Sequence, residues 1–283
     1  MTSGEPRIEI LPDPEATARA AASAIADALA QAVERRRRAL WATTGGSTPV
    51  AIYRELSVAP LREQVPWQNV HVWWSDDRYV PRDHPLSNML PLDQVLVSAS
   101  ARAGLSGTGE YGVDVDTGVE PGVPLPAGNI HAPRMNDAIG LAAGPEWAAS
   151  EYADRLRDAN LPTSSDGYPV FDLMLLGVGA DGHVMSVFPG SAVFESDAWV
   201  SAVPAPTHIE PHVPRISLHP GFLAATSLPM VVAHGAGKAE VMATLLGNER
   251  DVHRWPAQLA RREGAVWFLD RAAAAKLPPS LQG

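Results

Sequence analysis

The chain has 283 residues, 22 basic and 32 acidic, and its net charge of −10 disfavours a general nucleic-acid surface or an anionic-membrane surface. It contains no cysteine, which excludes disulfides, thiol nucleophiles and thiolate metal sites. The N-terminus lacks the pattern of a secretory signal, and no apolar run approaches the roughly 20 residues that span a bilayer, so we expect a soluble, cytoplasmic protein.

Strand-like and helix-like segments alternate along the chain. Apolar residues recur at helical spacing in 14–34, and 171–176 is almost wholly apolar, as in a strand covered on both faces. The alternation predicts a Rossmann-like α/β fold, a mainly parallel sheet with helices on both faces, in a single domain of residues 1–283. The predicted strands are 7–11, 39–43, 69–74, 171–176, 230–233 and 265–269, and the predicted helices 14–34, 86–97, 146–159 and 238–246, with a further helix that begins near Thr48.

Three stretches lie outside this alternation. Four arginines at 35–38 follow the first helix, where cations interact favourably with the helix dipole, so we interpret them as a solvated helix end and not as a phosphate site. Gly, Pro and Asp are frequent in 104–128, which predicts a long surface excursion. Prolines punctuate 204–214 and indicate an extended, irregular segment.

The turn after the second predicted strand has the composition of an anion site. Gly45 and Gly46 allow a tight turn, Ser47 and Thr48 supply hydroxyls, and we expect Thr48 to cap a helix that opens at Pro49. Glycines, hydroxyls and free helical N–H groups together can hold a phosphate. The alternative is a glycine turn with an ordinary helix cap.

A charged cluster follows the third predicted strand. Asp76 and Asp77 stand beside Arg78, so they could form an acid/base group with an orienting partner, or a solvated turn that neutralises itself. The sequence does not distinguish which of the two carboxylates would face a substrate. We interpret Ser87 and Asn88 downstream as caps of the next predicted helix.

The strand at 171–176 runs into a glycine loop, 177–183, that ends in Asp181, Gly182 and His183. Ligands collect at such strand ends in α/β sheets, and a histidine there can move a proton near neutral pH. The alternative is a tight turn with a satisfied histidine. The loop formally matches a dinucleotide-binding pattern, but Pro189 would interrupt the required helix, so we interpret the match as chance.

Two cations follow later strand-and-turn elements, where a ligand would lie. Arg215 comes after the proline-rich segment, and Lys238 opens a helix; each taken alone is more often a surface charge. We expect no metal site, because His208 and His212 have helical spacing but Pro211 lies between them.

Together these residues resemble the 6-phosphogluconolactonase family, within the broader glucosamine-6-phosphate isomerase/6-phosphogluconolactonase group. The likeness covers nearly the whole chain through the ordered blocks 44–49, 75–81, 177–190 and 214–238. The resemblance implies a cofactor-free hydrolase of 6-phospho-D-glucono-1,5-lactone in the oxidative pentose phosphate pathway. We expect a small sugar-phosphate substrate, no nucleic-acid or membrane partner, and a monomer or at most a weak homodimer.

The resemblance also implies roles for individual residues. His183 would be the general base that activates water, and Asp181 would position and polarise it. Arg78 would face the lactone carbonyl or a sugar hydroxyl, with Asp76 nearby. The residues expected to bind the substrate, chiefly its 6-phosphate, are Gly45, Gly46, Ser47, Thr48, Arg215 and Lys238, to which Asn88 is added.

The sister activity, a glucosamine-6-phosphate deaminase/isomerase, is the nearest alternative. Such deaminases typically carry a glutamate five residues after the histidine, followed by proline. Here that position is Phe188, followed by Pro189, so the ring-opening acid/base partner is missing and the lactonase is favoured. Further alternatives are a non-catalytic sugar-phosphate sensor and a nicotinamide-dependent oxidoreductase.

Overall fold

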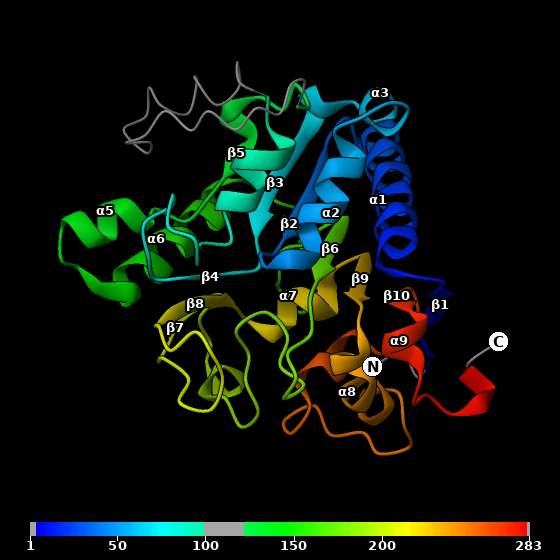
Figure 1. The fold of residues 1–283 in the computed structure, drawn as a ribbon. Helices are drawn as coiled ribbons and strands as arrows, with labels where there is room; N and C mark the ends of the chain where they lie inside the picture. The colour runs from blue at the N-terminus through cyan, green and yellow to red at the C-terminus, as the bar shows by residue number, and fades with distance from the viewer. Residues whose placement is uncertain (1–3, 99–121, 282–283) are drawn as a thin grey trace.

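The computed structural model of the protein describes residues 4–98 and 122–281, which build a layered α/β structure (Figure 1). Its centre is a seven-stranded sheet in which every pairing is parallel. In spatial order the strands are β1 (Arg7–Leu11), β10 (Val266–Asp270), β9 (Leu228–Ala233), β6 (Leu173–Leu176), β2 (Ala39–Thr43), β3 (Val70–Trp74) and β5 (Ile130–His131).

Helices cover both faces of this sheet. On one face Trp41 of β2 packs edge-on against Tyr53 of α2 (Ser47–Leu56), with the long helix α1 (Pro14–Arg36) beside it (Figure 1). On the other face Trp73 of β3 lies 6.1 Å from Tyr152 of α6 (Gly144–Asp158), measured between ring centroids. Successive strand residues point to opposite faces of the sheet. Because helices cover both faces, strands such as β6 are apolar throughout and not only at every second residue. The predicted fold class is confirmed.

The remaining helices are short. They connect the strands or pack near the C-terminal half of the sheet (Figure 1). Their bounds are α3 (Leu61–Gln64), α5 (Met135–Gly140), α7 (Pro220–Ala225), α8 (Ala239–Leu245) and α9 (Arg271–Ala274).

A second, three-stranded antiparallel sheet was not predicted. Its order is β4 (Asp76–Arg78), β8 (Arg215–Leu218) and β7 (Val200–Val203). The strands are short and β4 is wholly charged, so neither apolar alternation nor length signalled them. The pairing matters for function, because it brings the acidic cluster after β3 against Arg215, more than a hundred residues further along the chain.

The helix predicted at 86–97 is wrong over its first half. Only Leu92–Leu96 forms a short π-type helix, because the backbone and side chain of Asn88 are engaged by the carboxylates before it. The four-arginine run does end a helix, since α1 stops at Arg36 and Arg37 adopts a left-handed conformation there. The excursion predicted at 104–128 lies, up to residue 121, outside the described residues.

Buried apolar side chains from both halves of the chain form one continuous hydrophobic cluster. This supports the expected single domain of residues 1–283, which stays a prediction. Within residues 4–98 and 122–281, no helix combines the length and apolar character that crossing a bilayer would need.

Candidate active site

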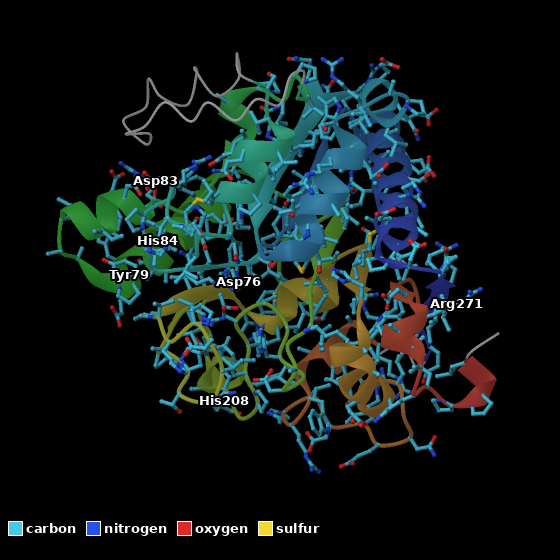
Figure 2. All side chains as sticks on the ribbon, in the orientation of Figure 1. Asp76, Tyr79, Asp83, His84, His208 and Arg271 are labelled. Carbon is cyan, nitrogen blue, oxygen red and sulfur yellow. The ribbon has the colours of Figure 1, made fainter. Side chains whose placement is uncertain are left out.

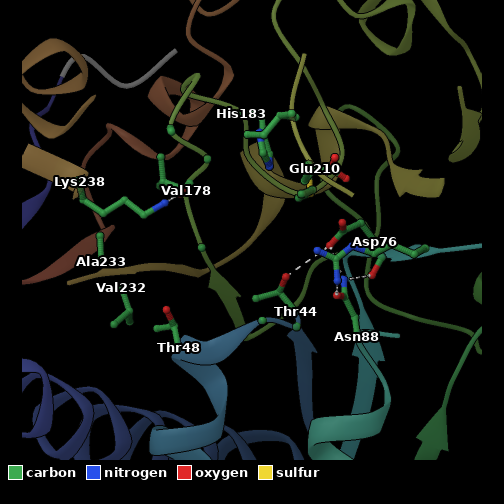
Figure 3. A pocket seen from close by; sticks show the side chains of 18 of the residues that line it. Thr44, Thr48, Asp76, Asn88, Val178, His183, Glu210, Val232, Ala233 and Lys238 are labelled. Atoms are coloured by element: carbon green, nitrogen blue, oxygen red, sulfur yellow. Dashed lines mark hydrogen bonds between the residues drawn. The ribbon is translucent and has the colours of Figure 1, made fainter. Parts of the chain in front are cut away.

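A cavity of about 420 Å³ opens where β2, β6 and β9 end (Figure 3). Parallel strands deliver their C-terminal loops to one edge of the sheet, so the loops at 44–48, 177–183 and 232–238 all contribute to its wall. Most of the predicted site residues line this cavity, namely Gly45, Gly46, Thr48, Asp76, Arg78, Asn88, His183, Arg215 and Lys238. Asp181, which the structure describes in full, does not.

The turn between β2 and α2 is shaped by its glycines. A side chain on Gly45 would lie 2.6 Å from Cα of Asn88, and Gly46 has a φ of +92°, which favours glycine. Gly46 is the N-cap and makes no side-chain hydrogen bond, so the prediction that Thr48 caps this helix is wrong. Thr48 instead lies in the first turn, 3.5 Å from Nε2 of His234. Ser47 is the first helical residue, and its side chain lies outside the description.

The two adjacent carboxylates after β3 have different environments. Asp76 lines the cavity, and its Oδ2 accepts a hydrogen bond of 2.7 Å from Ser186. Asp77 is fully buried, and its Oδ1 accepts the backbone N–H groups of Arg78 and Asn88 at 2.7 Å each. Burial raises the pKa of Asp77 to about 7. Asp76 therefore faces the cavity, while Asp77 organises the loop behind it.

Asn88 and its neighbour Ser87 are therefore not helix caps, contrary to the prediction. Ser87 Oγ donates to Asp77, and Asn88 Nδ2 donates to the backbone oxygen of Asp76 at 2.9 Å. The Oδ1 atom of Asn88 accepts a hydrogen bond of 2.6 Å from Arg78. The loop thus fixes one guanidinium at the cavity wall.

Two arginines stand opposite each other on the small sheet. Arg78 of β4 pairs in register with Arg215 of β8, and within the described ranges neither forms an ion pair with a carboxylate. Each keeps a buried Nε without a partner. Arg215 lies with its guanidinium 5.1 Å from the ring centroid of Phe188, and burial lowers its pKa. Facing like charges repel, so an anion between them would be strongly favoured.

His183 is held from behind by Asp181. Its Nδ1 lies 2.5 Å from Oδ1 of Asp181, and a side chain on Gly179 would collide with both groups. Burial alone would raise the pKa of Asp181, but the hydrogen bond and charge of His183 hold it well below its usual range. An ionised carboxylate only accepts, so Nδ1 of His183 donates to it, and Nε2 is the nitrogen left to exchange a proton with a substrate.

Lys238 approaches the cavity from the loop after β9. Its Nζ donates a hydrogen bond of 2.6 Å to the backbone oxygen of Val178, and burial lowers its pKa (Figure 3). The same loop is held at the end of β10, where the carboxylate of Asp270 accepts a hydrogen bond of 3.0 Å from the backbone N–H of Gly235. The predicted cation is therefore positioned by two independent contacts.

Sequence reasoning missed several side chains that belong to this site. Ser186 supports Asp76, Glu210 and His234 line the cavity, and Nε2 of His208 lies 2.8 Å from Oδ2 of Asp181. The segment 204–214 carries no regular periodicity, so nothing in its pattern indicated that it would fold back onto the glycine loop. No group of three or more potential metal-ligating side chains occurs in the part of the chain that the structure describes.

The loop at 177–191 does not continue into an α-helix, and only a four-residue 3-10 helix, Ala192–Glu195, follows it. It closes instead as a turn in which the N–H of Gly179 donates to the backbone oxygen of His183. The strand–glycine–helix context of a dinucleotide site is absent from this part of the described chain, which agrees with the interpretation of the glycine pattern as chance.

Comparison with known proteins places the chain in a family. The family model described as glucosamine-6-phosphate isomerases/6-phosphogluconolactonase matches residues 12–268. The chain belongs to this family. It is 30% identical to a 6-phosphogluconolactonase of Streptomyces coelicolor over 282 residues, which covers 99% of this chain and 97% of that protein.

Two further family members extend the comparison. A 6-phosphogluconolactonase of Mycobacterium tuberculosis is 32% identical over 272 residues, covering 96% of this chain and 98% of the relative. The solved structure of 6-phosphogluconolactonase from Trypanosoma brucei superposes with a TM-score of 0.77 at 25% identity, covering 98% of this chain and 100% of the other.

Proposed function

We propose that the protein hydrolyses 6-phospho-D-glucono-1,5-lactone to 6-phospho-D-gluconate. The observation that carries the proposal is the arrangement of one cavity, which His183 lines together with Arg78, Arg215 and Lys238. A proton acceptor next to several cations suits an anionic substrate that must be attacked by water. The relatives named 6-phosphogluconolactonase, matched along almost their whole length, support the same substrate.

The phosphate end of the substrate would lie against the β2–α2 turn and Lys238. Backbone N–H groups in the first turn of α2 have no partner within the helix, and the turn places no side-chain cap over them. Lys238 and Arg215 would supply positive charge that is incompletely solvated, because burial lowers the pKa of both. A dianionic phosphate would neutralise these buried positive charges, so its contacts with them would chiefly determine the affinity for the substrate.

At the other end His183 would act on water. Its Nε2 takes one proton as the water oxygen bonds to the lactone carbonyl carbon, and Arg78 stabilises the oxyanion that forms. The tetrahedral intermediate collapses by breaking the bond to the ring oxygen. That oxygen receives the proton from His183 and becomes a hydroxyl group, while the carbonyl carbon becomes a carboxylic acid. Asp181 stabilises the transient imidazolium through the bond to Nδ1.

The deaminase alternative requires an acid/base group where this chain has Phe188. The ring of Phe188 packs 4.7 Å from the ring of His183 and under the guanidinium of Arg215. An apolar ring at this place cannot transfer a proton, which favours lactone hydrolysis over deamination with isomerisation. A non-catalytic sensor remains the second alternative and predicts binding without turnover.

We also propose the setting in which this reaction takes place. The proposed substrate belongs to the oxidative pentose phosphate pathway, and we expect the protein to act in the cytoplasm, as a monomer or weak homodimer without a cofactor.

A direct assay separates these possibilities. Purified protein is mixed with freshly made lactone, and formation of 6-phosphogluconate is followed against the spontaneous rate. We expect a clear, enzyme-proportional acceleration, and no release of ammonia from glucosamine 6-phosphate. No acceleration with tight binding of 6-phosphogluconate would indicate a sensor, and ammonia release would indicate a deaminase.

A further inference from the structure

The carboxylate of Asp181 is shared between two histidines. Both contacts from His183, through Nδ1 at 2.5 Å and the backbone N–H at 3.2 Å, go to Oδ1. The other oxygen, Oδ2, lies 2.8 Å from Nε2 of His208, which comes from the segment after β7 (Figure 2). Among the described residues no other side chain holds Oδ2. The orientation of the carboxylate plane therefore depends on His208.

The direction of this second hydrogen bond follows from the charge of Asp181. Its pKa lies well below the usual range despite burial, so the carboxylate is ionised and can only accept. His208 must then donate from Nε2. An ordered donor on Oδ2 fixes the torsion of the Asp181 side chain and keeps Oδ1 aimed at the Nδ1 proton of His183.

His208 also touches the site through Phe188. The ring of Phe188 lies edge-on to His208, with centroids 5.8 Å apart, and tilted against His183 at 4.7 Å. The next two residues of the segment, Ile209 and Glu210, line the cavity. A purely structural role, in which His208 only anchors this wall, is thus the competing explanation, and a test must distinguish the two.

We propose that His208 is a positioning residue for the reaction, acting on His183 through Asp181. The inference rests on the proposed lactone hydrolysis, in which His183 is the proton acceptor. His208 does not reach the reacting atoms in this scheme, so its loss should reduce turnover and leave substrate affinity largely unchanged. A replacement side chain that still donates one hydrogen bond to Oδ2 of Asp181 should restore turnover.

The chain offers a matched control in His212. It belongs to the same segment, its side chain is 49% exposed against 51% for His208, and it contacts Glu210 and the backbone oxygen of Pro206 but not Asp181. If the segment as a whole determines activity, His212→Ala should be as harmful as His208→Ala. If the hydrogen bond to Asp181 determines activity, only His208→Ala should be harmful.

The experiment measures lactone hydrolysis by His208→Ala, His208→Gln and His212→Ala beside wild type. For His208→Ala we expect kcat to fall about three- to tenfold, the effect of losing one hydrogen bond to a charged group that water partly replaces, with KM within about twofold. His208→Gln should recover most of the lost kcat, and His212→Ala should match wild type. Wild-type kcat in His208→Ala, equal losses in both alanine variants, or no recovery by glutamine would overturn the proposal.

A second readout does not depend on turnover. In NMR spectra of histidine-labelled protein, the Nδ1 proton of His183 should be protected from solvent exchange in wild type and in His208→Gln, and exchange faster in His208→Ala. If the wild type does not hydrolyse the lactone, the proposed function fails, and this signal alone decides the positioning role. Unchanged exchange in His208→Ala would then reject it.

Discussion

The substitution Asp181→Asn examines the electrostatic part of the proposed mechanism. The carboxylate accepts from His183 at 2.5 Å and from His208 at 2.8 Å. An amide of the same shape has one accepting oxygen, so one of the two histidines must meet an N–H group. The negative charge that would stabilise an imidazolium at His183 is also lost.

The magnitude follows from the kind of bond that is weakened. A hydrogen bond to a charged group contributes about 1.5–3 kcal/mol. The bond between Asp181 and His183 should act mainly on the imidazolium that forms during the reaction, so its loss should lower kcat about 10- to 150-fold. KM should change little, because Asp181 does not line the cavity. Steady-state lactone hydrolysis, corrected for the spontaneous rate, measures both quantities.

A matched control removes the same charge elsewhere. Asp166 lies exposed in a turn outside the cavity, so Asp166→Asn should retain wild-type kcat. Unfolding temperatures of both variants show whether the fold is intact. A kcat for a well-folded Asp181→Asn within twofold of wild type would refute the reasoning, since an ionised partner would then contribute nothing to turnover.

Three further predictions concern the neighbouring residues. Asp77→Asn should flatten the pH dependence of stability: burial raises the folded pKa of Asp77 to about 7, so its contribution is fully present below the unfolded value near 4 and is lost as pH rises through 7. Denaturant unfolding at pH 5 and pH 8 measures this, and an unchanged difference between the two pH values would contradict it. Gly179→Ala should lower kcat at least about 100-fold in a folded protein, because the added methyl group displaces His183 and a displacement of 1 Å can cost that much. Normal turnover would show that His183 is not used as proposed. Lys238→Ala should raise KM about tenfold or more with a smaller change in kcat, because phosphate contacts are shared by ground and transition states; an unaltered KM would remove Lys238 from the phosphate site.

The sequence predicted six of the seven strands of the central sheet and the loops that follow them, but not the two-residue strand β5. The apolar segment at 171–176 could be recognised as a buried strand because parallel strands covered on both faces have no polar alternation. The same reasoning placed the Gly45–Gly46 turn, His183 and Lys238 at one sheet edge. These inferences needed only local composition and the rule that parallel strands end together.

The small antiparallel sheet and the supports behind the site could not be predicted in the same way. β4 consists of Asp76, Asp77 and Arg78, and its strand character comes entirely from pairing with β8, far along the chain. The pKa of Asp77 depends on complete burial, and the role of His208 depends on a loop folding back over 27 positions. Non-local contacts of this kind leave no periodicity in a single sequence.

The most direct measurement of the central claim is the turnover of His183→Ala on 6-phospho-D-glucono-1,5-lactone. We expect a folded protein that still binds 6-phosphogluconate, because the arginines, Lys238 and the glycine turn are untouched, but whose kcat has fallen by about 100-fold or more, as loss of a general base implies. A folded His183→Ala variant with a kcat close to wild type would contradict the claim that this imidazole activates water.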